Sequence, residues 1–536
     1  MRKYFYIFLS ACAIILASCS QGGNKEFRSI RNDVLRDKIA GGWAGKMIGV
    51  TYGAPTEFHA RQRTFDDSIR WKPGDIKGSI WQDDLYVQLT FLMAMDKYGI
   101  DAPAKVFQEM FAKAGYPLWH ANMQARKNYY DSIFAPQSGM PEYNIHADDI
   151  DFQIEADYIG FMCPGMPGKA SEIAGKIGHI MNYGDGLYGG VFVAALYSEA
   201  FFESDVKKVV KNALNSIPAE SDYHKIIDDV ILLHEHYPSD WKAAWKELDA
   251  KWGAVDICGA GDVFNIDAKL NGAYIVMGLL YGEGDPLKTL EISTRCGQDS
   301  DCNPSNALAV LGVMKGFSGL PSDMKKGVEA IGDSIFINTT YSFNKAVSAT
   351  FDYATRFITE NGGNTSGKKL KIKIQEMKAL PPEVSFPNLV FDRKISINDK
   401  EGIKLKGKWK TQEVKDGRKP SWIVSENKGD ILEFVFEGTG ISVEGNWVPD
   451  GGKADVTVDG KPGRSFDTYY DFSGQHHDNV SIWHRFGMEQ GKHVVTITVS
   501  GDKRPEAKGS KVYITGASIF KTAPKHNESF KFTFQL

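Results

Sequence analysis

The spacing of apolar residues divides the chain into a helical part and a strand-rich part. Between residues 28 and 360, apolar residues recur every three or four positions in several segments, which predicts amphipathic helices. The segments with this spacing are 87–92, 102–114, 173–180, 191–202, 206–217, 223–234 and 307–313. Strict alternation of apolar and polar residues is scarce there. The first part is therefore expected to be a compact α-helical body.

The pattern changes beyond residues 361–367, which are rich in glycine and asparagine and are typical of a linker. Alternating apolar residues then predict short strands, with glycine turn signals between them. These strands are expected within residues 431–443, 454–458, 494–499 and 512–519. Such spacing indicates a β-sandwich. The predicted domains are a helical domain (28–360), a linker (361–384) and an all-β sandwich (385–536).

The first residues resemble a bacterial lipoprotein signal. Arg2 and Lys3 precede an apolar run, residues 4–16, that is too short for a permanent membrane span. The run ends in Leu-Ala-Ser followed by Cys19. The resemblance implies a signal peptide (1–18), a lipid on Cys19 and a tether (19–27). The protein would be exported and anchored in the periplasm or outer membrane of a Gram-negative bacterium; an ordinary secretory signal is the alternative.

The composition bears on nucleic-acid binding, membrane contact and disulfide formation. The formal net charge of the 536 residues is −4, so a basic face for nucleic acid is not indicated. No later segment is long and apolar enough to cross a membrane, so the lipid anchor is the expected membrane contact. Cys163, Cys258, Cys296 and Cys302 follow the first nineteen residues, too few for a disulfide scaffold in a chain of this length. The oligomeric state is not indicated.

Two carboxylates, Asp299 and Asp301, lie just before a predicted helix. Asn303 is the expected N-cap of that helix, and Pro304 suits its first position. Alternate carboxylates in a loop suit a hard divalent cation, which prefers oxygen ligands. The alternative is a solvated turn that only caps the helix.

A second acidic pair lies more than 200 residues upstream. Asp83 and Asp84 open an amphipathic run, and alone they would only complement a helix dipole. If the fold brings them to Asp299 and Asp301, four carboxylates share one site and need a counter-ion. One or two divalent metal ions would supply it.

A third motif precedes both pairs. Residues 45–53 form a glycine-dotted helix that runs into the turn Gly-Ala-Pro-Thr-Glu, which ends at Glu57. The glycine-rich helix, this turn, the paired aspartates and the late Asp-x-Asp segment have the order and spacing of one family. Together they resemble the ADP-ribosylglycohydrolase family over about residues 30–335.

The resemblance implies an all-α fold that cleaves bonds at the anomeric carbon of ADP-ribose, usually with two Mg²⁺ ions; Mn²⁺ is an alternative. It implies metal ligands at Asp83, Asp84, Asp299 and Asp301, and it places Glu57 at the acidic residue that acts on water or the leaving group. Two such ions can orient hydroxyls and lower the pKa of a water. A carboxylate such as Glu57 can then serve as general acid or base.

Two residues depart from the family pattern. Gln82 replaces the threonine before the paired aspartates, and Cys302 replaces the threonine after the last one. The Gln82 carbonyl still suits a hard ion, so Gln82 is retained as a ligand candidate. A thiol is a poor ligand for Mg²⁺, so one metal site is expected to be altered, and Cys302 is expected only to line it.

Other polar residues are candidates for substrate contact. Glu155 and Asp157 belong to an acidic segment with apolar spacing, and a solvated face is the alternative for them. Asp185 and Tyr188 flank the second glycine-rich segment, a region that the family uses to shape the sugar pocket. His120 and His146 are isolated in the sequence, and such histidines more often pack or face solvent, so they are left out of the site.

The strand-rich domain resembles galactose-binding-like sandwiches appended to polysaccharide-degrading enzymes. Its aromatic rings either stack on sugars or fill the core of the sandwich. The rings and nearby histidines are Trp447, Tyr469, Tyr470, His476, His477 and Trp483.

Three functions follow as hypotheses. The first is an exported hydrolase that cleaves a glycosidic bond in a glycan or glycoconjugate, since an anchored exported protein does not meet cytosolic ADP-ribosylated proteins. The second is a true ADP-ribosyl hydrolase. The third, motivated by Gln82 and Cys302, is a non-catalytic glycan-binding lipoprotein.

Overall fold

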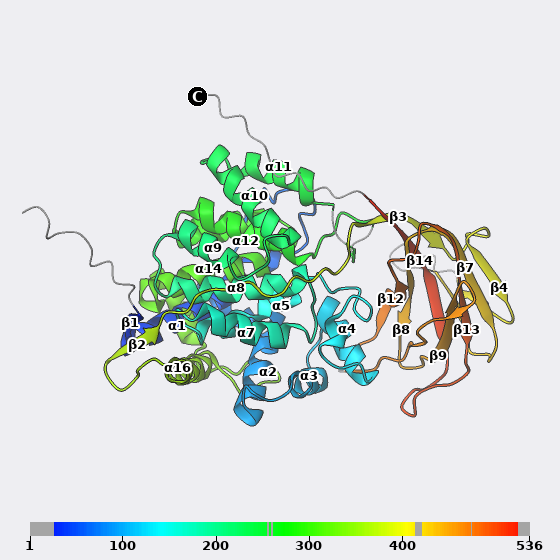
Figure 1. Cartoon of the computed structure of the whole chain (residues 1–536), viewed down its shortest axis with the longest axis horizontal. Helices are drawn as coiled ribbons and strands as arrows, with labels where there is room; N and C mark the ends of the chain where they lie inside the picture. Colours follow the sequence, from blue (N-terminus) through cyan, green and yellow to red (C-terminus); the bar gives the residue numbers. More distant parts are fainter. Residues whose placement is uncertain (1–25, 255–256, 259–260, 413–420, 473, 524–536) are drawn as a thin grey trace, which may run out of the picture.

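The structure is a computed structural model that describes residues 26–254, 257–258, 261–412, 421–472 and 474–523. A helical domain and a β-sandwich lie side by side (Figure 1). The predicted signal peptide, Cys19 and residues 19–25 of the predicted tether lie outside the described residues. Within the described ranges, no helix has the length and apolar character that a membrane crossing needs.

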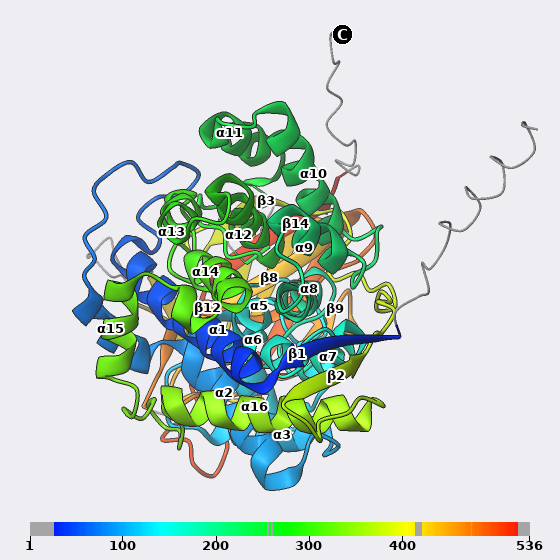
Figure 2. The same ribbon diagram turned by 90° about the vertical axis from the view of Figure 1, so that its left-hand side faces the viewer.

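The first domain is α-helical, as predicted, and Figure 2 shows its helices end-on and side-on around α1 and α14. Its α-helices are α1 (Asn32–Gly53), α2 (Asp83–Tyr98), α3 (Ala104–Lys113), α4 (His120–Tyr130), α5 (Asp151–Glu155), α6 (Asp157–Phe161), α7 (Pro167–Gly178), α8 (Asp185–Ala200), α9 (Val206–Leu214), α10 (Asp222–His236), α11 (Trp241–Trp252), α12 (Ala268–Gly282), α13 (Pro286–Arg295), α14 (Cys302–Lys315), α15 (Ser322–Ala330) and α16 (Phe343–Glu360). The 3₁₀ helices are the single turns η1 (Ala54–Thr56), η3 (Gln137–Gly139) and η4 (Phe317–Gly319) and the longer η2 (Pro73–Trp81).

Helix α14 begins earlier than the sequence suggested. Asp301 is its N-cap, and the Asp301 carboxylate accepts a hydrogen bond from the Cys302 amide at 2.9 Å. The prediction that Asn303 caps this helix is therefore wrong. The Asp301 side chain already accepts a hydrogen bond from an amide at the helix start, so the cap lies two residues before Asn303. Asn303 is a buried residue of the first turn.

Helices α1 and α14 are in backbone contact along a row of glycines. A Cβ atom placed on Gly45 would lie 2.6 Å from the Leu308 carbonyl oxygen, and one on Gly49 would lie 2.4 Å from that of Pro304. Gly41 and Gly53 continue the row, so glycine recurs every fourth residue on one face. The sequence needs these glycines because any side chain would hold the two helices apart.

A small sheet lies at the edge of the helical domain. Strand β1 (Phe27–Arg31) pairs antiparallel with β2 (Lys369–Lys373), so that Phe27 faces Lys373 and Arg31 faces Lys369. Helical structure was expected from residue 28, and residues 361–384 were expected to be a linker. The alternating buried residues Leu370 and Ile372 explain why β2 instead packs as a strand.

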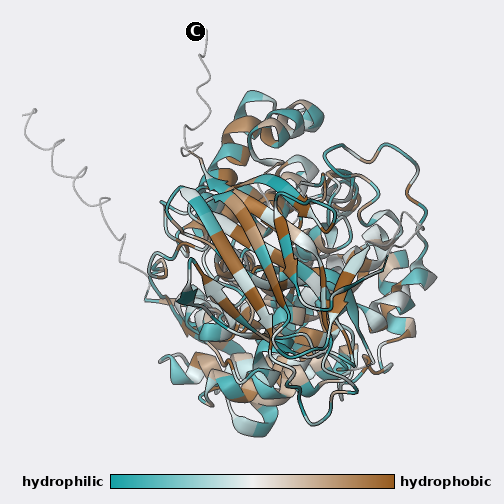
Figure 3. Cartoon of the chain, turned by 90° about the vertical axis from the view of Figure 1, so that its right-hand side faces the viewer, coloured by the Kyte–Doolittle hydropathy of each residue, from teal (hydrophilic) through white to brown (hydrophobic). Residues whose placement is uncertain are grey.

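The second domain is a sandwich of two antiparallel sheets. One sheet has the order β10-β9-β13-β7-β4 with β11 beside β9, and the other has the order β12-β8-β14-β6-β5 with β3 beside β14. Figure 3 shows apolar and polar residues alternating along these strands. The strands are β3 (Leu389–Ser396), β4 (Ile403–Lys406), β5 (Lys410–Gln412), β6 (Trp422–Ser425), β7 (Ile431–Gly438), β8 (Gly440–Trp447), β9 (Lys453–Val458), β10 (Lys461–Pro462), β11 (Phe466–Asp467), β12 (His477–Arg485), β13 (Gly491–Val499) and β14 (Val512–Thr522).

The two domains contact each other around α4, which lies beside β12 and β8 in Figure 1. The Tyr130 and Phe472 rings stack with centroids 3.8 Å apart, and Arg504 donates to the Tyr130 carbonyl at 2.9 Å. His484 Nε2 donates to the Pro141 carbonyl at 2.6 Å. These contacts fix the sandwich against one side of the helical domain.

The aromatic rings of the sandwich that were considered for sugar binding are mostly buried. Trp447 and Trp483 are each 2% exposed, Tyr470 is 0% and Tyr469 is 7%. The Trp447 and Tyr470 rings stack on each other at 5.7 Å. These four rings therefore fill the core and the domain contact, which is the second of the two alternatives stated for them.

The glycine row gives a test of helix packing. Gly49→Ala should lower the free energy of unfolding by about 1–3 kcal/mol, because the new methyl group meets α14 backbone that cannot move aside. Gly74→Ala is the matched control, since nothing lies within 4 Å of a Cβ there. Urea denaturation of both variants measures the difference, and equal stability would contradict the packing role.

Buried His484 gives a test of pH dependence. Burial, Arg464 and His146 lower the pKa of His484 to about 3. The unfolded chain, with a histidine pKa near ~6.5, therefore binds more protons between those values, and stability falls as pH falls through that window. Relative to His484→Gln, the wild type should lose about 1.4 kcal/mol of stability per pH unit between pH ~6 and ~4.

Urea denaturation at several pH values measures this slope. The exposed His59→Gln is the control and should keep the wild-type dependence. Identical slopes in the wild type and His484→Gln would refute the assignment.

Candidate functional site

The turn that carries Glu57 is bound to the loop that carries Asp299 and Asp301. The Phe58 amide donates to the Gln298 carbonyl at 3.0 Å, and the Gln298 amide donates to the Ala60 carbonyl at 2.8 Å. The Thr56 and Ser300 hydroxyls hydrogen-bond at 2.7 Å. Two segments more than 200 residues apart are thereby held in register.

Asp83 and Asp84 open α2, and Gln82 is its N-cap. Asp84 is fully buried, and its Oδ2 accepts from Lys46 Nζ at 2.6 Å and from the Ser305 hydroxyl at 3.2 Å. Because Ser305 belongs to α14, this contact joins the two acidic pairs. The structure therefore brings α2 and α14 together, as the acidic motifs suggested.

The acidic residues lie close enough together to raise one another's pKa values. Loss of hydration raises the pKa of Asp83 to about 7, and Asp84 adds to the shift. Glu57 is exposed as a residue, yet desolvation of its carboxyl, followed by Asp301 and Asp83, raises its pKa to about 8. Burial, with Asp299 as the next cause, raises the pKa of Asp301 well above its usual value. We call Glu57, Asp83, Asp84, Asp299 and Asp301 the acidic centre.

A buried lysine neutralises part of this charge. Lys46, on the glycine-dotted α1, is 0% exposed, and its Nζ lies 3.1 Å from Asp157 Oδ2 as well as 2.6 Å from Asp84. It also donates to the Ile154 carbonyl at 2.7 Å. Opposite charges on both sides raise the pKa of Lys46, which stays protonated despite its burial. Sequence reasoning missed Lys46, and a lysine between Gly45 and Gly49 was the available signal.

Glu155 and Asp157, predicted to contact substrate, instead contact buried groups of the protein. Asp157 is fully buried, and its carboxylate accepts from Lys46, Tyr197, Gln88 and Asn306. Glu155 is also fully buried and accepts from Asn122, with its Oε2 unpartnered. The structure thus places both carboxylates within the protein interior, with protein groups as their partners.

Asp185 and Tyr188 lie at the start of α8. The Asp185 carboxylate accepts from the Tyr223 amide at 3.0 Å. The Tyr188 hydroxyl donates to the Pro381 carbonyl at 3.0 Å and accepts from the Glu383 amide at 2.5 Å. Tyr188 therefore holds the segment between the domains, and these contacts do not join it to the acidic centre.

The acidic centre has the donors that a hard divalent cation needs. Asp84 Oδ1 and Asp299 Oδ1 are buried without a hydrogen-bond partner, which is costly for carboxylate oxygens unless a cation or proton satisfies them. Asp299, Asp301 and Cys302 also present donor atoms within 4.8 Å of one another. The residues fit Mg²⁺ or Mn²⁺ through their carboxylates.

Cys302 fits such an ion less well. Burial, then Asp299 and Asp301, raise the pKa of its thiol well above the usual value, which disfavours the thiolate. A neutral thiol is a weak ligand for any metal, and sulfur suits Mg²⁺ least. Gln82 makes no side-chain cap, and its assignment as a ligand stays a prediction.

Comparisons with known proteins identify the helical part. A protein-family model described as ADP-ribosylglycohydrolase matches residues 31–348, more than half of the chain. A solved structure titled "ADP-ribosylglycohydrolase-related protein complex" is 13% identical with a TM-score of 0.42, covering 60% of this chain and 98% of that one. No curated protein matches the chain.

Other solved structures overlap a smaller part of the chain. A family two carbohydrate esterase from Cellvibrio japonicus is 18% identical with a TM-score of 0.17, over 25% of this chain and 36% of that one. A carbohydrate-binding module, CBM36, in complex with calcium and xylotriose is 16% identical with a TM-score of 0.16, over 24% of this chain and 100% of that one.

The buried lysine gives a test of the charge balance. Lys46→Met should lower the free energy of unfolding by about 3–5 kcal/mol, because Asp84 and Asp157 lose their buried partner. Lys77→Met, at an exposed position, should change stability by less than about 0.5 kcal/mol. Thermal and urea denaturation measure both. Equal stability of the two variants would show that Lys46 is not the counter-charge.

Proposed function

The chain belongs to the ADP-ribosylglycohydrolase family, and on that premise we propose that it is a metal-dependent hydrolase of a glycosidic bond at an anomeric carbon. The observation that carries this proposal is geometric: hydrogen bonds hold the turn with Glu57 against the loop with Asp299 and Asp301. A further hydrogen bond joins Asp84, at the start of α2, to Ser305 of α14. The unpartnered buried oxygens of Asp84 and Asp299 are suited to a cation. The remaining oxygens of Asp84 and Asp301 accept hydrogen bonds from protein groups, which hold these carboxylates in place.

Asp83, Asp84, Asp299 and Asp301 are the residues that would hold Mg²⁺ or Mn²⁺. When bound, such ions orient sugar hydroxyls and lower the pKa of a nearby water. The chain itself fixes the carboxylates: Lys46 and Ser305 orient Asp84, and the Cys302 amide orients Asp301. This preorganisation is what the reaction requires of the protein.

Glu57 is proposed as the proton-transfer residue. It follows the single turn η1 and faces solvent, whereas Asp84, Asp299 and Asp301 are buried, so substrate can reach it. Burial of its carboxyl, followed by Asp301 and Asp83, raises the pKa of Glu57 above its usual value. A carboxyl with a raised pKa can give a proton to a leaving-group oxygen. The resulting carboxylate can then accept a proton from attacking water.

An exported glycan or glycoconjugate is the proposed substrate. This rests on the lipoprotein-like N-terminus with Cys19, which would anchor the protein at a membrane outside the cytoplasm. Trp81, directly before Gln82, is 56% exposed and offers an aromatic face of the kind that stacks on sugar rings. Trp447, Tyr469, Tyr470 and Trp483 of the sandwich are buried, so this proposal does not use them as sugar contacts.

A panel of glycans and ADP-ribosylated substrates tests the reaction class. The mature chain should release sugar from a glycan in the presence of Mg²⁺ or Mn²⁺, and lose this activity on chelation and in an Asp299→Ala Asp301→Ala double variant. Release of ADP-ribose with no glycan turnover would instead identify an ADP-ribosyl hydrolase. Glycan binding in calorimetry, without turnover or metal, would identify a non-catalytic protein.

Glu57→Gln tests the proton-transfer role. The amide cannot exchange a proton, so kcat should fall about 10²–10⁴-fold while the bound metal content stays unchanged. Steady-state kinetics and elemental analysis measure the two quantities. Glu220→Gln, at an exposed position on another turn, is the control and should keep wild-type kcat. A kcat within a few-fold of the wild type would remove Glu57 from the mechanism.

A further inference from the structure

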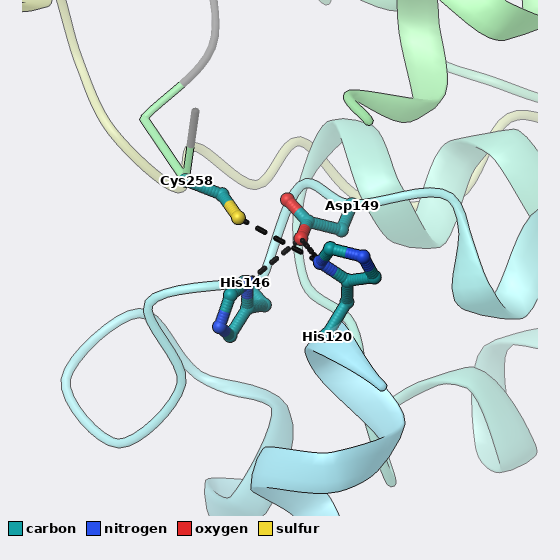
Figure 4. Close-up of side chains that lie close together, drawn as sticks. All are labelled: His120, His146, Asp149 and Cys258. Carbon is teal, nitrogen blue, oxygen red and sulfur yellow. Dashed lines mark hydrogen bonds and ion pairs between the residues drawn. The ribbon is translucent and has the colours of Figure 1, made fainter. Parts of the chain in front are cut away.

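A second cluster of potential metal ligands lies outside the acidic centre. His120 begins α4, His146 and Asp149 belong to the loop before α5, and Cys258 follows α11. One donor atom from each of these four residues lies within 4.8 Å of the others. Figure 4 shows the two imidazoles and the thiol pointing towards the Asp149 carboxylate.

The separations within this cluster are close to those of a tetrahedral site. Cys258 Sγ lies 3.7 Å from His120 Nδ1, and His120 Nδ1 lies 3.4 Å from Asp149 Oδ2. Ligands bound tetrahedrally to zinc at the usual ~2.0–2.3 Å are about 3.6 Å apart for nitrogen and sulfur and about 3.3 Å apart for nitrogen and oxygen. His146 Nδ1 lies 2.8 Å from the same Asp149 oxygen and would move outward by about 0.5 Å.

The same geometry argues against a catalytic cysteine triad. In a triad, the carboxylate and the nucleophile contact opposite nitrogens of the histidine ring. Here the thiol and the carboxylate both lie against Nδ1 of His120. Both histidines also direct Nδ1 towards one oxygen of Asp149. Donor atoms converging on one point are typical of metal ligation.

The surroundings hold this convergence in place. His120 has a φ of 43°, a backbone conformation that is unfavourable for a residue with a side chain. Its ring stacks on Phe264 with centroids 5.7 Å apart, and the Asp149 amide donates to the His146 carbonyl at 3.0 Å. Asp149 is only 3% exposed. The ligands are therefore largely preformed.

We infer that His120, His146, Asp149 and Cys258 form a binding site for a borderline transition-metal ion, with Zn²⁺ as the best match. Two neutral imidazoles, one thiolate and one carboxylate would balance the charge of a divalent ion. Sulfur and imidazole ligands select zinc over magnesium, the reverse of the preference at the acidic centre. This inference does not depend on the proposed function.

The proposed zinc site lies where the helical domain meets the sandwich. His120, His146 and Cys258 line a cavity of about 290 Å³ whose other wall includes Glu444 and His477 of the sandwich. Four protein ligands correspond to a closed, structural type of zinc site. The ion would join three distant segments of the helical domain at the surface that receives the sandwich.

Cobalt substitution of the purified mature chain tests this inference. Co²⁺ bound to a thiolate gives a charge-transfer band in the near ultraviolet, so the full chain should show this band at one equivalent of Co²⁺. Cys258→Ser should abolish the band, and His146→Gln should weaken Co²⁺ and Zn²⁺ binding by at least about 100-fold. Elemental analysis should find one zinc per chain that Mg²⁺ does not displace.

Matched variants separate this site from the rest of the protein. Cys302→Ser, at the acidic centre, and Cys163→Ala, a buried thiol elsewhere, should both keep the band. An Asp83→Asn Asp84→Asn variant should also keep it. A band that survives Cys258→Ser, or one that disappears with Cys302→Ser, would overturn the inference. So would stoichiometric zinc in a folded His146→Gln Cys258→Ser variant, with folding checked by circular dichroism.

Discussion

The backbone contact between α1 and α14 is the constraint on which the acidic centre depends. Gly45 and Gly49 allow the two helices to touch, and Gly53 brings the end of α1 against the loop that holds Ser300 and Asp301. The turn with Glu57 follows at once, so its position is set by helix packing rather than by the turn alone. A wider separation would move the glutamate away from the aspartates that it must work beside.

The same contact explains how so much negative charge is tolerated. It buries Lys46 between Asp84 and Asp157, and it lets the Ser305 hydroxyl reach Asp84. One lysine cannot balance five carboxyl groups. Burial, and after it the neighbouring carboxylates, raise the pKa values of Asp83 and Glu57. Protons and metal cations therefore compete for the carboxylates of the acidic centre, as is usual at a metal-binding site.

Residues with local motifs could be predicted from the sequence, and residues with purely spatial roles could not. Asp83, Asp84 and Glu57 lie beside helix starts and glycine turns, so their places in the chain identify them. Lys46 resembles a solvated lysine until the stretch 41–51 of its helix is seen to be buried at every position. Cys258 is 138 residues from His120 in the sequence, and only the tertiary fold brings them together. Asp157 lies in an acidic segment, which suggested substrate contact, but it is buried and its carboxylate pairs with Lys46.

The pairing of β1 with β2 has a consequence for how the protein is made. Phe27 is among the first described residues, yet its strand partner, Lys373, lies beyond the last helix of the domain. The glycine face of α1 is likewise covered only after α14 has been synthesised. During synthesis from the N-terminus, the first strand and α1 therefore emerge long before their partners exist, and non-local contacts of this kind form slowly. The newly emerging chain has to keep an apolar, glycine-rich helix from associating elsewhere until α14, which begins at Cys302, has also been made.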